Sequence, residues 1–168
     1  MGFLLYYNWA RFGNVTDFGF DYLLAGEFFK DVLHEYGTFN VRLAPRNFFY
    51  HFIFYPFLIK DYTSLIGGSV FLLSPLFFAI FPGIRECKPW WSICGLLLSI
   101  VAAYLPSLIY HGTGWVQFGS RYTLDFIVPM LILTAIGIQK WPLRIVLFLT
   151  IISTIQFMTG TYVLINFD

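Results

Sequence analysis

Long stretches without a charged side chain constrain this chain more than any other feature of its sequence. No Asp, Glu, Lys or Arg occurs in residues 62–84, 89–120 or 145–167. A helix needs about 20 predominantly apolar residues to cross the hydrocarbon core of a bilayer. Each of the three stretches is long enough for such a helix. The sequence therefore predicts an integral membrane protein.

The amino-acid composition supports the same prediction. Only 11% of the residues are charged and 58% are hydrophobic, whereas an ordinary soluble domain has about 25% charged residues. A surface that faces water cannot be built from so few charges, so lipid must solvate part of the chain. The net charge is +1 and no basic block is present that would neutralise nucleic-acid phosphates. We therefore expect membrane lipid as a partner and no nucleic acid.

The apolar pattern of residues 61–168 predicts four transmembrane helices. The expected spans are 65–81, 90–110, 122–139 and 142–165. Pro75, Pro106 and Pro129 fall inside three of them, where each proline removes a backbone donor and kinks the helix. Carbonyl groups freed in this way need partners in lipid, which favours a packed bundle. The predicted fold class is thus an all-α, polytopic transmembrane helix bundle.

The first 60 residues hold most of the charges and are predicted to lie largely outside the membrane. Residues 1–7 form a short apolar run, which we interpret as the end of a truncated transmembrane helix, with a true chain start as the alternative. Segment 8–60 is predicted to be extracytoplasmic. Within it, residues 47–59 are rich in aromatic side chains but too short to span, so we expect an aromatic interfacial helix, with a re-entrant segment as the alternative.

The short loops predict the orientation in the membrane. Arg85 and Lys88 lie in one predicted loop, and Lys140 and Arg144 lie in another. An excess of basic residues in short loops marks the cytoplasmic side. With four spans these two loops share a side, so the loop before the third span and the long polar segment face outward.

The histidines and cysteines do not form a recognisable metal site. His34, His51 and His111 are scattered without the spacing of metal ligands, and Cys87 and Cys94 have no CxxC or histidine companion. We expect two free thiols and no cofactor from these residues.

Two stretches on the predicted outer face combine aromatic residues, glycine, an arginine and an aspartate. They read YYNWARFGNVTDFG at 6–19 and GWVQFGSRYTLDF at 114–126. Arg121 and Asp125 are four apart, so on an α-helix they would share a face and could pair to anchor the third span. Alternatively, Arg121, beside Tyr122 and Gln117, binds an anionic head group, because guanidinium matches phosphate in bidentate geometry.

A polar residue in the last predicted span is expected to pack against other helices. Gln156 lies at mid-membrane depth close to Ser153, Thr154 and Thr159, and buried polar groups in bilayers usually hydrogen-bond to neighbouring helices. The spans contain no ionisable residue away from their ends, which argues against an ion-coupled transporter.

At the two outer stretches the sequence resembles prokaryotic polytopic membrane proteins of the GT-C glycosyltransferase class, the dolichyl-phosphate-mannose-protein mannosyltransferase-like set. The residues that carry the resemblance are YNWARFG at 7–13, DFG at 17–19, QFGSRY at 117–122 and DF at 125–126. The resemblance covers most of this chain but only the C-terminal half of the family.

This resemblance implies transfer of a sugar from a polyprenyl-phosphate donor on the outer face of a prokaryotic plasma membrane. It implies that Arg121, Tyr122, Gln117 and Arg11 line the donor-phosphate region. In the family, the acidic residues that act as base or hold a divalent metal usually lie in the first outer loop, which this chain does not match. No catalytic residue is therefore assigned. The alternative is a non-enzymatic multi-span scaffold or transporter component.

Overall fold

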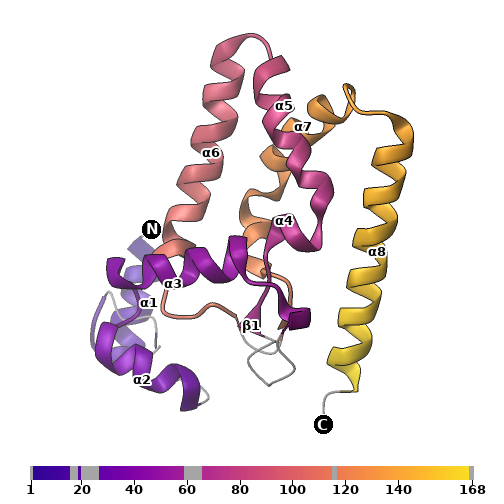
Figure 1. Cartoon of the computed structure of the whole chain (residues 1–168). Coiled ribbons are helices and arrows are strands. Elements are labelled where there is room, and N and C mark those ends of the chain that lie inside the picture. The colour runs from indigo at the N-terminus through magenta and orange to yellow at the C-terminus, as the bar shows by residue number, and fades with distance from the viewer. Residues whose placement is uncertain (1, 16–18, 20–26, 59–65, 115–116, 167–168) are drawn as a thin grey trace. The chain divides into compact units, whose positions relative to one another are not determined.

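The computed structural model describes residues 2–15, 19, 27–58, 66–114 and 117–166 (Figure 1). The described residues are mostly helical, with a single two-stranded sheet among them. The chain divides into two compact units, Met1–Thr38 and Phe39–Asp168.

The first unit contains helices α1, Gly2–Phe12, and α2, Glu27–Tyr36. Helix α1 continues beyond residue 7, where the sequence predicted a membrane stub to end, and includes Arg11 in its last turn. Its apolar side chains are exposed, whereas Asn8 is buried and donates to the carbonyl of Val15 over 3.3 Å. A helix that turns a polar residue inward and apolar residues outward suits an apolar environment.

The second unit begins with a continuous helical stretch that is rich in aromatic residues. It consists of η2 (Val41–Leu43), α3 (Ala44–Phe48) and the π-helical turn η3 (Phe49–Ile53), and the short turn η4 (Pro56–Leu58) follows. The predicted aromatic helix at 47–59 therefore begins earlier, at Val41, and ends at Ile53. It ends there because Phe54 has an extended backbone and Pro56 has no N–H to continue the helix.

This helical stretch is polar on the inside. Asn47 and His51 are completely buried, whereas Phe48, Phe49 and Ile53 are about half exposed. Such a distribution is the reverse of that in a water-soluble helix, so an apolar environment suits its outer face. The location of this face at the membrane interface stays a prediction.

The predicted span at 65–81 does not form one continuous helix in its described part, 66–81. The chain passes through β1 (Ile66–Gly67), α4 (Val70–Leu73), the 3-10 helix η6 (Pro75–Ala79) and α5 (Ile80–Glu86). The break lies at Ser74, whose backbone is not helical. Pro75 then starts η6, because a proline lacks the N–H that would continue α4 but fits the first position of a new helix.

Three helices among the described residues are long and apolar enough to cross a membrane. They are α6 (Trp90–Ile109), the stretch Arg121–Ile138 and α8 (Leu143–Ile165). The middle one consists of the 3-10 helix η7 (Arg121–Phe126) followed by α7 (Ile127–Ile138). Very few residues of α6 and α8 are buried within the protein. The large apolar surface that they expose is compatible with an integral membrane protein.

The prolines of these three spans lie at different positions in their helices. Only Pro106 lies well inside a helix, α6, whereas Pro129 occupies the first turn of α7, where a missing N–H costs little.

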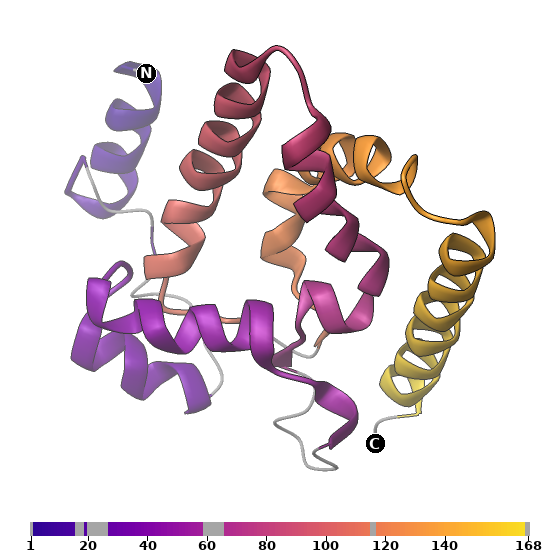
Figure 2. The ribbon, with the colours of Figure 1, turned by 45° about the horizontal axis from the view of Figure 1, so that its top comes forward.

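Helices α5 and α7 form the closest helix pair of the second unit (Figures 1 and 2). A Cβ atom added to Gly83 would collide with the backbone of Leu133, and one added to Gly137 would collide with the backbone of Ala79. Small residues at such positions allow two backbones to approach closely, as in many membrane helix pairs. The adjoining hydrophobic core consists of Val70, Ile80, Cys87, Phe126, Met130 and Leu133.

An ion pair joins the two loops that were predicted to share a side of the membrane. Lys140 Nζ lies 3.4 Å from a carboxylate oxygen of Glu86. The loop after α5 and the loop after α7 therefore lie at the same end of the helices, as the sequence predicted. That this end is cytoplasmic stays a prediction.

The hydroxyl groups of several α8 residues bond within that helix. Ser153, Thr154 and Thr159 each donate to the carbonyl four residues earlier in α8. The predicted hydrogen bonds to neighbouring helices are thus not formed by these three residues. The side-chain carbonyl oxygen of Gln156 is buried without a hydrogen-bond partner among the described residues.

Candidate functional site

The segment that carries Gln117, Arg121 and Tyr122 is held in place by strand β2 (Gln117–Phe118). This strand pairs in parallel with β1, with Gln117 opposite Ile66 and Phe118 opposite Gly67. On its other side, the Phe118 ring packs against Gly160 of α8, where any side chain would collide with it. The sheet and α8 together fix where η7 begins.

The turn between β2 and η7 depends on a glycine. Gly119 has a φ of +82°, a left-handed conformation that L side chains rarely adopt. Ser120 follows it and is buried, and its carbonyl accepts a hydrogen bond from the Thr123 hydroxyl over 2.6 Å. This turn places Arg121 at the first position of η7.

The predicted ion pair between Arg121 and Asp125 is absent. Among the described residues the one ion pair joins Lys140 to Glu86. The reason is geometric, because residues 121–126 form a 3-10 helix. With about three residues per turn, side chains four apart point in different directions. The interpretation of this pair as a membrane anchor was therefore wrong.

Arg121 instead lies beside aromatic rings and is exposed. Its guanidinium carbon is 5.2 Å from the centre of the Tyr122 ring, which is cation–π distance. The Arg121 charge also affects the pKa of Tyr110. Burial is the main cause that raises the pKa of the Tyr110 phenol, Tyr122 raises it further, and Arg121 lowers it.

Arg121 and Gln117 line one pocket of about 260 Å³. The Ser120 side chain also lines this pocket, and its hydroxyl oxygen is buried without a hydrogen-bond partner among the described residues. The Gln117 amide nitrogen donates to the Thr113 carbonyl over 3.4 Å, whereas its Oε1 lacks a partner in the described part of the chain. The structure thus brings two of the four predicted donor-phosphate residues to one pocket.

The other two predicted residues lie elsewhere. Tyr122 does not line this pocket but turns inward, with its ring centre 5.7 Å from that of His51 and 5.9 Å from that of Tyr110. Arg11 belongs to the first unit. There its guanidinium donates to the Tyr7 hydroxyl over 2.8 Å and lies 5.2 Å from the centre of the Phe12 ring. The site described here consists of residues of the second unit.

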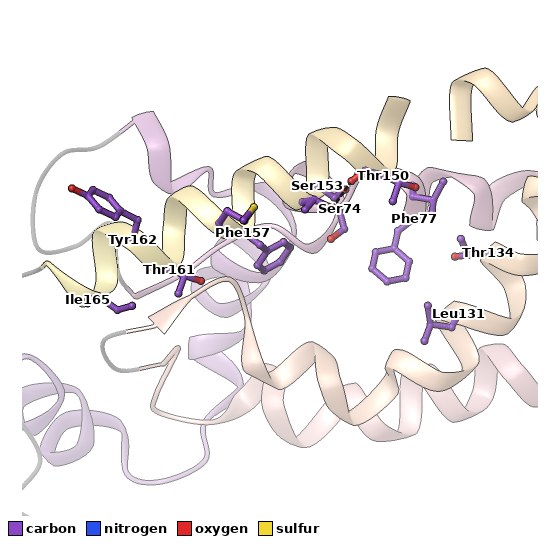
Figure 3. A pocket seen from close by; sticks show the side chains of 13 residues that line it. Ser74, Phe77, Leu131, Thr134, Thr150, Ser153, Phe157, Thr161, Tyr162 and Ile165 are labelled. Atoms are coloured by element: carbon purple, nitrogen blue, oxygen red, sulfur yellow. Dashed lines mark hydrogen bonds between the residues drawn. The ribbon is translucent and has the colours of Figure 1, made fainter. Parts of the chain in front are cut away.

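A larger apolar groove of about 760 Å³ adjoins the small pocket (Figure 3). One face of α8 lines it together with residues of α7 and η6, as the labelled side chains in Figure 3 show. Ser74, Phe77 and Phe157 line both the groove and the small pocket. The groove and the small pocket are therefore adjacent, and Arg121 lines the small pocket.

The groove is apolar although several threonines and serines line it. The hydroxyls of Thr134, Thr150, Ser153 and Thr154 each donate to a carbonyl of their own helix over 2.8–2.9 Å. Their polar atoms are thereby satisfied, and the methyl groups of the threonines remain for contact with an apolar ligand. The groove consequently suits a hydrocarbon chain better than a polar molecule.

The described lining of the groove and the small pocket suits the binding of an anion attached to an apolar chain. Among the described residues that line the two spaces, Arg121 is the one charged side chain, and none is Asp, Glu or His. No group of three His, Cys, Asp or Glu residues that could hold a metal ion occurs in the described part of the chain. These lining residues can bind an anion attached to an apolar chain, but they contain no carboxylate that could act as a general base.

A buried polar cluster beneath Tyr122 was not predicted from the sequence. His51 is completely buried, and its ring centre lies 5.8 Å from that of Tyr104. Burial lowers the pKa of His51 to about 4; the Thr113 backbone acts in the opposite direction, and the Arg46 charge adds a smaller lowering. The signal available in the sequence was a lone histidine in an aromatic run, which also fits an exposed interfacial residue.

A second feature that the sequence did not reveal closes the end of α6. The Asn47 amide donates to the carbonyls of Leu108 over 2.9 Å and Tyr110 over 2.7 Å, and more distantly to that of Ser107. Arg46 donates to the His111 carbonyl. Carbonyls at a helix C-terminus have no partners within the helix, so these side chains stabilise the end of α6 at the edge of the apolar region.

Comparisons with known proteins do not identify a family for this chain. No protein-family model matches it, and neither the curated proteins nor the solved structures contain a match.

Proposed function

We propose that the second unit binds an anionic polyprenyl-phosphate lipid, and that the chain is the C-terminal membrane region of a glycosyltransferase-like protein. The sugar donor is polyprenyl-phosphate-linked and is used on the extracytoplasmic face of a prokaryotic plasma membrane. One observation carries the proposal. The apolar groove adjoins a pocket that contains Arg121, and Ser74, Phe77 and Phe157 line both.

The two spaces match the two chemical parts of such a lipid. The isoprenoid chain would occupy the groove along α8, where contact with apolar side chains replaces contact with other lipid. The phosphate would lie at Arg121, whose guanidinium can donate two parallel hydrogen bonds to it. The Gln117 amide and the Ser120 hydroxyl line the same pocket and can donate further bonds.

The assignment to sugar transfer rests on the resemblance to GT-C glycosyltransferases at residues 7–13 and 117–122. In such a reaction the phosphate is the leaving group, and a fixed cation stabilises the charge that develops on it. Arg121 is the proposed source of that charge. The base that accepts the proton of the acceptor is assigned to no residue of this chain.

A second candidate is a lipid-binding protein without catalytic activity. It is favoured by the absence of Asp, Glu and His from the described lining of the groove and pocket. On this alternative the chain is a membrane scaffold or a transporter component that binds an anionic lipid.

The binding step can be tested on the whole chain in lipid nanodiscs. Native mass spectrometry with a long-chain polyprenyl monophosphate should give a bound complex, whereas the uncharged polyprenol should bind more weakly. Arg121→Gln should weaken phosphate binding by about tenfold or more, because a hydrogen bond to a charged group contributes about 1.5–3 kcal/mol. Arg144→Gln is the control, since Arg144 is exposed at the start of α8, at the opposite end of α7 from Arg121.

A transfer assay separates the two candidates. Polyprenyl-phosphate-linked sugar and a mixture of acceptor peptides are incubated with the chain and with membranes from the source cells. Sugar transfer that Arg121→Gln reduces supports the glycosyltransferase, whereas lipid binding without transfer supports the non-enzymatic alternative. Equal binding of polyprenol and its phosphate would contradict both.

A further inference from the structure

Three segments bring buried polar side chains together beneath η7. They are the π-helical turn η3, which carries His51, the outer part of α6, which carries Tyr104, and the segment before β2, which carries Thr113. His51 is 0% and Thr113 1% exposed. The Tyr104 hydroxyl is likewise inaccessible. None of the three lines the groove or the small pocket, so this cluster is a separate feature.

Most polar atoms of this cluster lack protein partners. The Tyr104 and Thr113 hydroxyls are without hydrogen bonds to the described residues, and the His51 ring, which interacts with the Thr113 backbone, makes no hydrogen bond of ordinary geometry there. Buried polar atoms are almost always hydrogen-bonded, to protein or to ordered water, because leaving them bare in an apolar interior is costly. Several such atoms near one another can share a hydrogen-bonding ligand.

The chemistry of the cluster points to a neutral ligand. A neutral imidazole offers one donor and one acceptor, and each hydroxyl offers both. The groups that face His51 supply no negative charge: Tyr104 and Tyr122 contribute their rings, Thr113 contributes its backbone, and Arg46 is positive. The Arg46 charge disfavours a cation there, and the His51 imidazole, whose pKa burial lowers to about 4, adds no positive charge at pH 7 that would hold an anion. Water satisfies two to four polar partners in such sites.

We propose that His51, Tyr104 and Thr113 enclose ordered water that hydrogen-bonds all three side chains. The water joins η3, α6 and the segment before β2, and it lies beneath the Tyr122 ring that supports Arg121. The cluster thus holds the start of η7 in position by bonds to water rather than by direct bonds between side chains. The inference stands independently of the lipid bound at Arg121.

Hydrated and dry clusters respond in opposite ways to isosteric apolar substitution. If water is bound, Tyr104→Phe and Thr113→Val each remove a partner from a satisfied network and lower the Tm. If the cluster is dry, each substitution removes an unsatisfied group, and the Tm stays the same or rises. The Tm of the purified chain in nanodiscs at pH 7.5 distinguishes the two. Tyr6→Phe is the control, because Tyr6 is exposed on α1 and lines neither the groove nor the small pocket.

The double variant tests whether the two side chains share the water. We expect the combined loss in Tm for Thr113→Val with Tyr104→Phe to be smaller than the sum of the single losses, since the first substitution already disrupts the hydrogen bonds that the second would remove. Unchanged or raised Tm values in the single variants, or strict additivity, overturn the proposal.

A direct measurement keeps the test decisive if a variant fails to fold. Solid-state NMR of the unaltered chain, labelled with ¹⁵N-histidine in bilayers, should show magnetisation transfer from water to the ring of the most slowly exchanging histidine. His34→Gln and His111→Gln variants assign that signal to His51. A His51 ring without transfer from water would overturn the inference.

Discussion

At the residue scale, local helix geometry decides what Arg121 can contact. The spacing of Arg121 and Asp125 predicted a pair on an α-helix, but the 3-10 geometry of η7 separates them. The arginine is consequently left beside the Tyr122 ring and at the edge of a pocket. A helical type that the sequence does not specify thus makes a cation available to a ligand.

His51 predicts a pH dependence of stability. Its pKa is lowered to about 4 in the folded chain from an ordinary value of 6.5, so the unfolded chain binds more protons between these values. Stability should therefore be complete above pH 6.5 and decline as the pH falls towards 4, by about 3 kcal/mol in total.

Chemical unfolding in detergent at a series of pH values measures this dependence. The decline should disappear in His51→Phe and persist in His34→Gln, because His34 is exposed. A decline of the same size in His51→Phe would assign the effect to other groups.

At the element scale, the contact between α5 and α7 depends on two glycines rather than on large apolar residues. Gly83 and Gly137 let the two backbones touch, and a side chain at either position would collide with the facing helix. Helix pairs in lipid gain little from burying apolar surface and depend on close packing instead. This contact also holds α7 and hence the end of η7.

Gly83→Ala is therefore expected to destabilise the chain, although alanine forms helices better than glycine. The added methyl group would have to push α5 away from the Leu133 backbone, at a cost of about 1–3 kcal/mol. Gly95→Ala in α6 is the matched control, because nothing lies within 4 Å of its added Cβ atom. It should be neutral or stabilising by up to about 1 kcal/mol.

Thermal unfolding of the two variants in the same nanodiscs measures the difference. A Gly83→Ala variant as stable as Gly95→Ala would show that the two helices can separate without loss. The contact of α5 with α7 would then not determine the position of η7.

At the scale of the whole molecule, apolar surface faces outward and polar contacts face inward. Helices α6 and α8 expose apolar side chains along their length, while Asn47 and His51 are buried. The ion pair of Lys140 with Glu86 lies at one end of the helices. Arg121 lies at the other end of the stretch that leads to Lys140.

This arrangement predicts which residues are accessible from each side of the membrane. In a background of Cys87→Ala and Cys94→Ala, Lys88→Cys should react with a membrane-impermeant maleimide only after the cells are permeabilised. Arg42→Cys should react in intact cells, because residue 42 belongs to the segment predicted to face outward. Both residues are exposed within the protein, so burial does not limit their labelling. The reverse labelling pattern would invert the orientation and move Arg121 to the cytoplasmic side.

The sequence by itself predicted a membrane protein and the positions of three long apolar helices, at 90–110, 122–139 and 142–165. Long uncharged runs are sufficient for this, since backbone hydrogen bonding in lipid leaves a helix as the simplest spanning structure. Pro75 indicated from the sequence that the span at 65–81 is disturbed, but the tertiary structure alone decided that Arg121 does not pair with Asp125 and that His51 is buried. These features depend on contacts between residues distant in sequence and on the local helix type. Apolar periodicity encodes neither, because it reports how strongly a segment avoids water and not which segment it packs against.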